Sequence, residues 1–211
     1  KERITNSNNI TIEWSIPKDI SGILGYRMLL TQDINEPIPE KYDFFIDPTI
    51  TLTNYKNLSD GKYFFKIVAF DNAGNRSEES IYSFEIDTTP PEPPKFVDIE
   101  LDENMALLSN SPVIKWASSS DGVEDRYRYY YKFITDINEY ENIIKKVKDS
   151  DFIPTNTNYI EFKDLDNGYL IVGVKGYDIA GTISDTNWNV FKLDKYVVKT
   201  FITEIVTKKI N

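Results

Sequence analysis

Apolar and polar residues alternate with a period of two along most of this chain. In residues 63–70, Tyr63 and Phe65 fall on one side of an extended strand, and Lys66 and Val68 fall on the other. Turn-forming residues, such as the Asp, Asn and Gly of residues 71–75, interrupt these segments at intervals of about 8 to 12 residues. The pattern predicts short antiparallel strands joined by tight turns, which is typical of an all-β fold.

The same order of motifs occurs twice. The segment LSDGKYFFKIVAFDNAGN at 58–75 returns as LDNGYLIVGVKGYDIAG at 165–181. Trp14 at the end of ITIEW is matched by Trp116 at the end of PVIKW, and Tyr26 is matched by Tyr129. The motif DINE occurs at 33–36 and again at 136–139. These matches predict a duplication that produced two domains of about 100 residues each.

The boundaries follow from the repeat. We expect a first domain at 1–89, a Pro-rich linker at 90–94 and a second domain at 95–194. Four prolines within 87–94 fix φ and favour a short, stiff, extended linker. Residues 195–211 are rich in β-branched side chains and lie beyond the last matched strand. This tail is expected either to open a further element or to add an edge strand.

One helix is predicted in the second domain, within extra residues that the first domain lacks. Asn138 is expected to cap it, with Glu141 at the third helical position. Its apolar face has the spacing i, i+3, i+4 and i+7 and comprises Tyr140, Ile143, Ile144 and Val147.

Composition excludes several classes of function. A net charge of −10 and a pI of about 4.6 argue against nucleic-acid binding, which depends on clustered Lys and Arg. The chain has no histidine and no cysteine, so the commonest zinc and copper ligands and a thiol nucleophile are absent. No apolar run approaches the ~20 residues of a membrane helix. We therefore expect no cofactor, no metal site and no membrane insertion by this segment.

Two groups of carboxylates could suggest glycoside hydrolysis, which needs a pair about 5 to 10 Å apart. The first group is Asp121, Glu124 and Asp125, and the second is Asp149 and Asp151. Catalytic carboxylates need a cleft and partial burial, and no feature of the sequence supplies either. We expect solvated acidic loops and no enzymatic activity.

A calcium site is the next candidate, because side-chain oxygens gather at the two equivalent turns. These residues are Asp71, Asn72 and Asn75 in the first copy and Asp178 in the second. Their spacing does not match an EF-hand loop, whereas Asp and Asn commonly bond to nearby backbone amides in turns. Turn formation is the favoured interpretation, and calcium stays open as the alternative.

A candidate interaction face follows from the alternation. If Tyr63 and Phe65 face the core, their neighbours face outward and form a surface unusually rich in apolar residues. The predicted face comprises Phe64, Val68 and Phe70 in the first domain and Arg128, Tyr130, Lys132, Tyr169, Ile171 and Tyr177 in the second. Such a face suits a protein interface. The alternative is that the inserted helix or the adjacent domain already covers it.

These motifs together resemble fibronectin type III domains, especially bacterial versions with a D-x-A-G-N turn. The resemblance covers residues 10 to 194 in two copies and implies an all-β chain of two tandem fibronectin type III-like β-sandwiches, with one short helix inserted in the second. It also implies that Trp14 and Trp116 lie in the two cores and that Tyr63 forms the tyrosine corner of such sandwiches, where Leu170 stands in the second copy. The inward residues of the following strand would be Tyr26, Met28 and Leu30, or Tyr129, Tyr131 and Phe133.

The resemblance is informative about the fold and nearly silent about activity. It implies a non-catalytic spacer and protein-interaction module of a larger bacterial envelope, periplasmic or secreted protein, and hence an extracytoplasmic location. The expected partners are other envelope proteins or the rest of the same chain, and a scaffold role in a periplasmic assembly is included. The alternative function is an accessory or carbohydrate-binding region of a glycan-active enzyme or adhesin, which would contact glycan through exposed tyrosines.

Overall fold

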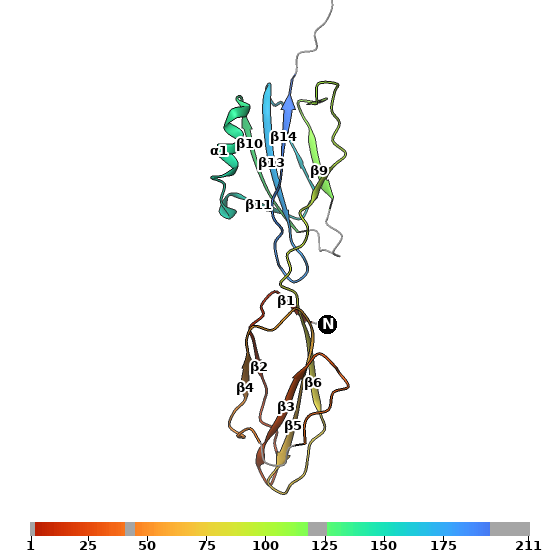
Figure 1. Cartoon of the computed structure of the whole chain (residues 1–211), viewed down its shortest axis with the longest axis vertical. Coiled ribbons are helices and arrows are strands. Elements are labelled where there is room, and N and C mark those ends of the chain that lie inside the picture. The colour runs from red at the N-terminus through yellow and green to blue at the C-terminus, as the bar shows by residue number, and fades with distance from the viewer. Residues whose placement is uncertain (1–2, 41–44, 118–125, 195–211) are drawn as a thin grey trace, which may run out of the picture. The chain divides into compact units, whose positions relative to one another are not determined.

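The computed structural model describes residues 3–40, 45–117 and 126–194 (Figure 1). Nearly all of its regular structure is β-strand, with one short α-helix and two 3-10 turns. The chain divides into two compact units. Unit 1 comprises Lys1–Glu92, Ser120–Glu124 and Tyr177–Ser184, and unit 2 comprises Pro93–Ser119, Asp125–Gly176 and Asp185–Asn211.

Unit 1 is a sandwich of two sheets. The larger sheet has the strand order β1-β6-β5-β3, and β2 and β4 form the smaller sheet. Neighbouring strands are antiparallel except for β1, which runs parallel to β6. The strands are β1 (Arg3–Thr5), β2 (Ile10–Glu13), β3 (Ile23–Thr31), β4 (Leu52–Tyr55), β5 (Gly61–Asp71) and β6 (Ser80–Ile86).

Unit 2 repeats this plan with two additions. Its larger sheet has the order β11-β10-β13-β14-β8, and its smaller sheet has the order β12-β9-β7. The short strand β8 runs parallel to β14, as β1 does to β6 in unit 1. The strands are β7 (Lys95–Val97), β8 (Ala106–Leu107), β9 (Val113–Ala117), β10 (Tyr127–Ile134), β11 (Ile153–Thr155), β12 (Tyr159–Glu161), β13 (Gly168–Gly176) and β14 (Asn187–Leu193).

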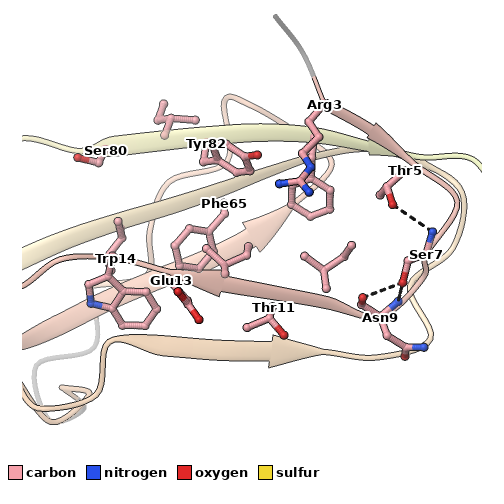
Figure 2. Close-up of a pocket in the computed structure, with 15 residues that line it drawn as sticks. Arg3, Thr5, Ser7, Asn9, Thr11, Glu13, Trp14, Phe65, Ser80 and Tyr82 are labelled. Atoms are coloured by element: carbon pink, nitrogen blue, oxygen red, sulfur yellow. Dashed lines mark hydrogen bonds between the residues drawn. The ribbon is translucent and has the colours of Figure 1, made fainter. Parts of the chain in front are cut away.

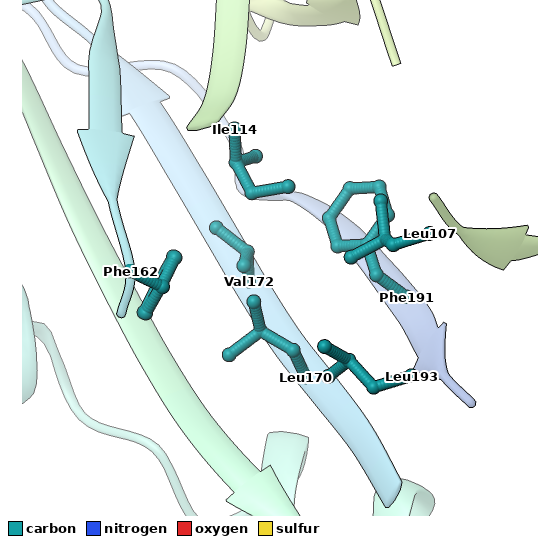
Figure 3. Packing of buried hydrophobic residues seen from close by; sticks show 7 residues of the cluster. All are labelled: Leu107, Ile114, Phe162, Leu170, Val172, Phe191 and Leu193. Atoms are coloured by element: carbon teal, nitrogen blue, oxygen red, sulfur yellow. The ribbon is translucent and has the colours of Figure 1, made fainter. Parts of the chain in front are cut away.

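Each unit has its own apolar core between its two sheets. In unit 1 the buried cluster is Ile12, Tyr63, Phe65, Phe84 and Ile86. In unit 2 it is Leu107, Ile114, Phe162, Leu170, Val172, Phe191 and Leu193, which Figure 3 shows converging from facing strands. Inward residues that alternate with outward ones along each strand produce this arrangement.

The predicted helix is present and shorter than its apolar pattern suggested. It comprises α1 (Tyr140–Ile144), preceded by the 3-10 turn η1 (Ile137–Glu139). The predicted cap at Asn138 was wrong. The N-cap residue of α1 is Glu139, which makes no side-chain cap bond, and Asp136 caps η1 by accepting a hydrogen bond from the Asn138 amide. A second 3-10 turn, η2 (Asp149–Asp151), leads into β11.

The two core tryptophans have equivalent partners. The ring of Trp14 packs edge-on against Tyr26, with centroids 5.6 Å apart, and the ring of Trp116 packs in the same way against Tyr127 at 5.8 Å. The structural equivalent of Tyr26 is therefore Tyr127, and the match of Tyr26 to Tyr129 was wrong by two residues. The error kept the correct face of the strand, because a shift of two preserves side-chain direction.

Not every residue expected to face inward is covered. Met28 and Leu30 pack against the core of unit 1, and Phe133 packs against that of unit 2. Tyr131 also faces inward, because its ring packs edge-on against the core residue Phe162 with centroids 5.2 Å apart, but it remains 46% exposed.

The tyrosine corner is present in unit 1. The Tyr63 hydroxyl donates a hydrogen bond to the carbonyl oxygen of Ser59 at 2.9 Å, one residue from the predicted position near Leu58. Leu170 takes the corresponding place in unit 2, since Tyr63 and Leu170 each lie two residues after the first glycine of β5 and β13. Leu170 is fully buried and packs in the apolar cluster of unit 2.

This topology defines the fold. Two sheets packed face to face over one apolar core, and the tyrosine corner of unit 1, are features of immunoglobulin-like sandwiches. Each unit is thus a fibronectin type III-like β-sandwich, and the helix is inserted in unit 2, as the sequence predicted. Within the described residues, none of the helices has the length and apolar character needed to cross a membrane.

Candidate functional site

The predicted interaction face of unit 1 is largely buried. Val68 is 1% exposed and Lys66 is 4% exposed, so neither presents a surface to a partner. The Lys66 ammonium donates to the Glu36 carbonyl oxygen at 2.7 Å and pairs with the Glu79 carboxylate at 3.4 Å. Phe64 is only half-buried. The prediction of an open face was wrong here, because the segment after β3 packs on the outer side of the sheet.

The other end of this face is covered by a cation-aromatic cluster. The ring of Phe45 packs against Phe70 with centroids 5.0 Å apart. The Arg27 guanidinium lies over both rings, at 4.8 and 4.9 Å from their centroids. Phe70 is therefore held within unit 1 rather than offered to a partner.

The corresponding face of unit 2 is covered by the inserted segment. Ile171 is fully buried, contrary to its predicted exposure. The Tyr130 ring contacts Phe152 and Trp188, with centroids 6.0 and 5.7 Å apart, and burial raises the pKa of Tyr130 above its ordinary value. The Lys175 ammonium lies over the Phe152 ring. Of the other predicted residues, Lys132 is exposed, and Arg128, Tyr169 and Tyr177 are half-buried.

The sequence reasoning missed the residues that cover this face. The indole ring of Trp188 packs directly over Gly173, and a Cβ added to Gly173 would lie 2.5 Å from that ring. A glycine within a strand often marks such a close approach. Gly173 was the available signal that a bulky side chain lies over the outer side of β13.

The oxygen-rich turn of unit 1 is organised by its own backbone. One Asp71 carboxylate oxygen accepts hydrogen bonds from the amides of Ala73 and Asn75, and the other accepts from the Asn75 side chain. The bond from the Asn75 side chain is the main reason why the pKa of Asp71 is lowered. Asp178 accepts from the Thr182 amide in the matching turn. These hydrogen bonds agree with the favoured interpretation, in which the side chains of Asp71 and Asp178 stabilise turns.

Of the two predicted groups of carboxylates, the structure describes only the second. Asp121, Glu124 and Asp125 lie outside the described residues. Asp149 binds the Lys175 ammonium, and that hydrogen bond and the positive charge lower the pKa of Asp149. The Asp151 carboxylate accepts from the Lys148 amide at the start of η2. No group of three or more acidic residues suited to a metal ion occurs in the part of the chain that the structure describes.

A groove on unit 1 is the principal candidate site. It has a volume of about 540 Å³ and lies between β2 and the edge formed by β1 and β6. Figure 2 shows Trp14 and Phe65 at its inner side and Arg3, Glu13 and Tyr82 around it. The lining also includes Thr5, Ser7, Asn9, Ile10, Thr11, Ile12, Ile67, Ser80, Ile81 and Phe84. The groove thus reaches the edge of the core, although Phe65 and Phe84 in its lining are each only 2% exposed.

Strand β2 presents one backbone edge to this groove. Within the described residues β2 pairs with β4 alone. The Trp14 amide donates to the Thr51 carbonyl, and Asn8 accepts from the Leu58 amide, so residues 8, 10, 12 and 14 direct their backbone groups toward β4. The alternate residues, Thr11 and Glu13, direct theirs toward the open edge. An added strand would find its hydrogen-bonding partners there.

In unit 2 the corresponding edge is occupied by a strand, β7. Strand β7 pairs antiparallel with β9, and Phe96 lies directly opposite Trp116. The Phe96 ring packs edge-on against Phe191 at 5.5 Å and joins the apolar core. Phe191 is the counterpart of Phe84, because they pair with Leu170 and Tyr63 respectively. Phe84 lines the groove of unit 1. The groove thus corresponds to the place of Phe96 in unit 2.

Comparisons with known proteins add little beyond the fold. No family model and no curated protein matches the chain. The FN1-FN3 domains of chicken CNTN1 are similar over 90% of this chain, at 17% identity and a TM-score of 0.42, and the chain spans 64% of that structure. The fibronectin(III)-like modules of Clostridium thermocellum CbhA are similar over 97% of this chain and 95% of theirs, at 15% identity and a TM-score of 0.46. The fold assignment rests on the strand order and register given above.

The groove combines apolar and polar side chains. Its titratable side chains are Arg3, Glu13 and Tyr82, and its lining also carries the hydroxyls of Thr5, Ser7, Thr11 and Ser80. An apolar floor beside an unpaired strand edge matches β-augmentation, in which backbone bonds supply affinity and side-chain pockets supply specificity.

Proposed function

We propose that this chain is a non-catalytic structural and interaction module of a larger protein, and that the groove of unit 1 receives an extended strand, as the corresponding place in unit 2 receives β7. The strand adds antiparallel to β2 and inserts an aromatic or large aliphatic side chain beside Trp14 and Phe84. The correspondence with β7, whose Phe96 fills the equivalent place, carries the proposal.

The finer parts of the function rest on the family resemblance. The module acts as a spacer within a bacterial envelope, periplasmic or secreted protein, with the Pro-rich segment 90–94 as a stiff linker between the predicted domains at 1–89 and 95–194. Glycan contact is the second candidate, supported by the exposure of Tyr82 and Tyr131, each 46% accessible. Binding of the chain to immobilised polysaccharide, abolished by Tyr131→Ala, would favour that candidate instead.

The test of strand binding uses a peptide taken from the chain itself. A synthetic peptide of residues 93–101, PPKFVDIEL, carries β7, and a control peptide has Asp in place of Phe96. Titration into the full chain, followed by NMR, should shift the amide signals of Thr11 and Glu13 with the first peptide only. Unshifted signals with both peptides would refute strand binding at this groove.

A backbone variant separates strand addition from other contacts. Glu13→Pro removes an amide that points away from β4, and proline is tolerated on the open side of an edge strand. The variant should fold as the wild type does and lose peptide binding. Glu13→Ala, which keeps the amide, is the matched control and should bind. Equal binding by the two variants would show that no strand pairs with β2.

A further inference from the structure

We propose that unit 2 binds one ring of a neutral glycan in a second cavity, between the inserted helix α1 and the outer side of β10. This inference rests on the second candidate function, glycan contact, and gives it a site other than Tyr82 and Tyr131. It does not depend on strand binding in the groove of unit 1. Within the described residues α1 is the one α-helix, and the sandwich of unit 1 forms without a counterpart.

The cavity has a volume of about 340 Å³, at the lower end of the range for sites that hold small molecules. It lies where α1 runs beside β10 (Figure 1). Strand β10 forms one wall with Tyr130 and Lys132. The insert forms the other wall with Glu139, Asn142, Ile143, Lys146, Val147 and Asp151.

The insert directs polar as well as apolar side chains toward the sheet. Glu139, Asn142 and Lys146 lie at i, i+3 and i+7, so they share one face of α1 and its flanking turns. Ile143 and Val147 add an apolar part to the same wall. A helix that served only to cover the sheet would turn an apolar stripe toward it. The mixed wall is instead typical of a site that orients a ligand by a few polar groups.

The polar side chains of this cavity are available to a ligand. Among the described residues, the ammonium groups of Lys132 and Lys146 and the side-chain amide of Asn142 form no hydrogen bond or ion pair. Lys145, by contrast, pairs with Glu141 at 3.4 Å. The first three side chains are exposed to solvent, so a ligand that bonds to them breaks no interaction of the fold.

The insert is anchored near its end rather than at α1. Phe152 is 6% exposed and packs against Tyr130 and Trp188. The Asp149 carboxylate accepts a hydrogen bond from the Lys175 ammonium at 2.5 Å. In contrast, α1 has no buried residue. The wall that α1 forms can therefore shift toward a ligand without disrupting the core.

The charges of the cavity identify the class of ligand. The ammonium groups of Lys132 and Lys146 and the carboxylates of Glu139 and Asp151 line it, so its net charge is zero. An anion would approach the two carboxylates, a cation would approach the two lysines, and an apolar ligand would remove water from all four groups. A sugar ring has hydroxyls that both donate and accept hydrogen bonds, and an apolar C–H face that suits the Tyr130 ring.

Exposure favours a neutral ligand over a zwitterion. The four charged side chains are all exposed, so water and salt screen the attraction that a zwitterion would need. Hydrogen bonds to hydroxyls act only at contact and are not screened in this way. Binding of the neutral ring should therefore be weak, saturable and nearly independent of salt.

NMR titrations of the full chain test the site with cellotetraose, xylotetraose and chitotetraose. At least one of these neutral probes should shift the amide signals of Lys132 and Ile143, at low and at high salt. Asn142→Ala and Lys146→Met each remove one hydrogen-bonding group and should each weaken binding by about 3- to 10-fold. Lys145→Met is the matched control, because Lys145 is adjacent to Lys146 and does not line the cavity. It should bind as the wild type does.

The outcomes distinguish this inference from the glycan function on which it rests. Unshifted signals with all three neutral probes, or equal binding by Lys146→Met and Lys145→Met, would overturn the site. Larger shifts with tetragalacturonate or alanylalanine would overturn the neutral ring in favour of an anion or a zwitterion. Polysaccharide binding that is lost in Tyr131→Ala and retained in Lys146→Met would overturn this site and leave glycan contact standing. No binding of the wild-type chain to any polysaccharide would overturn both.

Discussion

Replacement of Phe96 by Ala tests whether β7 closes unit 2 in the way that the groove of unit 1 implies. Phe96 lies opposite Trp116 and packs edge-on against Phe191, and it contributes to the apolar clusters around Ile114 and around Trp116. Removal of its ring would expose these core residues from the side on which unit 1 is open.

The expected loss follows from the burial of the ring. A fully buried Phe→Ala change costs about 3 to 5 kcal/mol. Phe96 is half-buried, so we expect the loss of its buried area to cost about half of that range. The edge-on contact with Phe191 adds about 0.5 to 1.5 kcal/mol. We expect Phe96→Ala to lower the free energy of unfolding of unit 2 by about 2 to 4 kcal/mol. Phe96→Leu, which retains an apolar anchor, should cost less than about 1.5 kcal/mol.

Urea denaturation of the full chain, followed by NMR signals assigned to each unit, measures this loss. The midpoint for unit 2 should fall, and the midpoint for unit 1 should remain unchanged. Phe96→Ala should also allow unit 2 to bind the peptide of residues 93–101. A loss below about 1 kcal/mol, or equal effects of Ala and Leu, would refute the idea that this ring closes the sandwich.

Two further predictions concern unit 1. Tyr63→Phe removes the hydroxyl that donates to Ser59, and it should lower the free energy of unfolding of unit 1 by about 1 kcal/mol in the same urea experiment; an unchanged midpoint would contradict a stabilising corner. The hydrogen bonds from Asn75 and Ala73 hold the pKa of Asp71 below its ordinary value of 3.8, so the folded state resists protonation more than the unfolded state does. This contribution is present above about pH 4 and is lost as the pH falls below it. The thermal stability of Asp71→Asn should therefore change less between pH 6 and about pH 3 than that of the wild type, and an identical acid response would contradict this role.

Local pattern predicted the strands because each strand buries one face in its own core. The period of two around Tyr63 and Phe65 identified β5, and the repeat then identified β13. The resemblance supplied the tyrosine corner, and the hydroxyl of Tyr63 is bonded as that motif requires. These features depend on residues near one another in sequence or on a well-characterised motif, which explains why they were predictable.

The predicted interaction face failed because a strand that is apolar on both sides is usually buried on both sides. Val68 and Ile171 were assigned to an exposed surface by alternation alone. Their covers come from distant segments, around Glu36 and Phe45 in unit 1 and around Phe152 and Trp188 in unit 2. Alternation identifies the two faces of a strand but cannot tell which neighbouring segment packs on each.

The groove was not predictable, because its place depends on how the strands of each unit pair. Thr5 and Leu107 precede their tryptophans by the same nine residues, and each belongs to the strand that runs parallel to the last strand of its unit. Upstream of this point unit 2 has β7, which covers the flank of β9. By the same spacing the corresponding position in unit 1 would fall before Lys1, and the flank of β2 lines the groove. The register of β7 on β9, rather than any local pattern, identifies this correspondence.

The parallel pairing of β1 with β6 determines how unit 1 would respond to mechanical force. Arg3 pairs with Phe84 and Thr5 pairs with Ile86, so a pull on the two ends of this unit would draw β1 and β6 past each other along their length. Hydrogen bonds loaded in this shearing direction break together rather than one after another. A chain under tension would therefore meet its main resistance at these short strands, and single-molecule pulling would register it as one abrupt rupture of the unit.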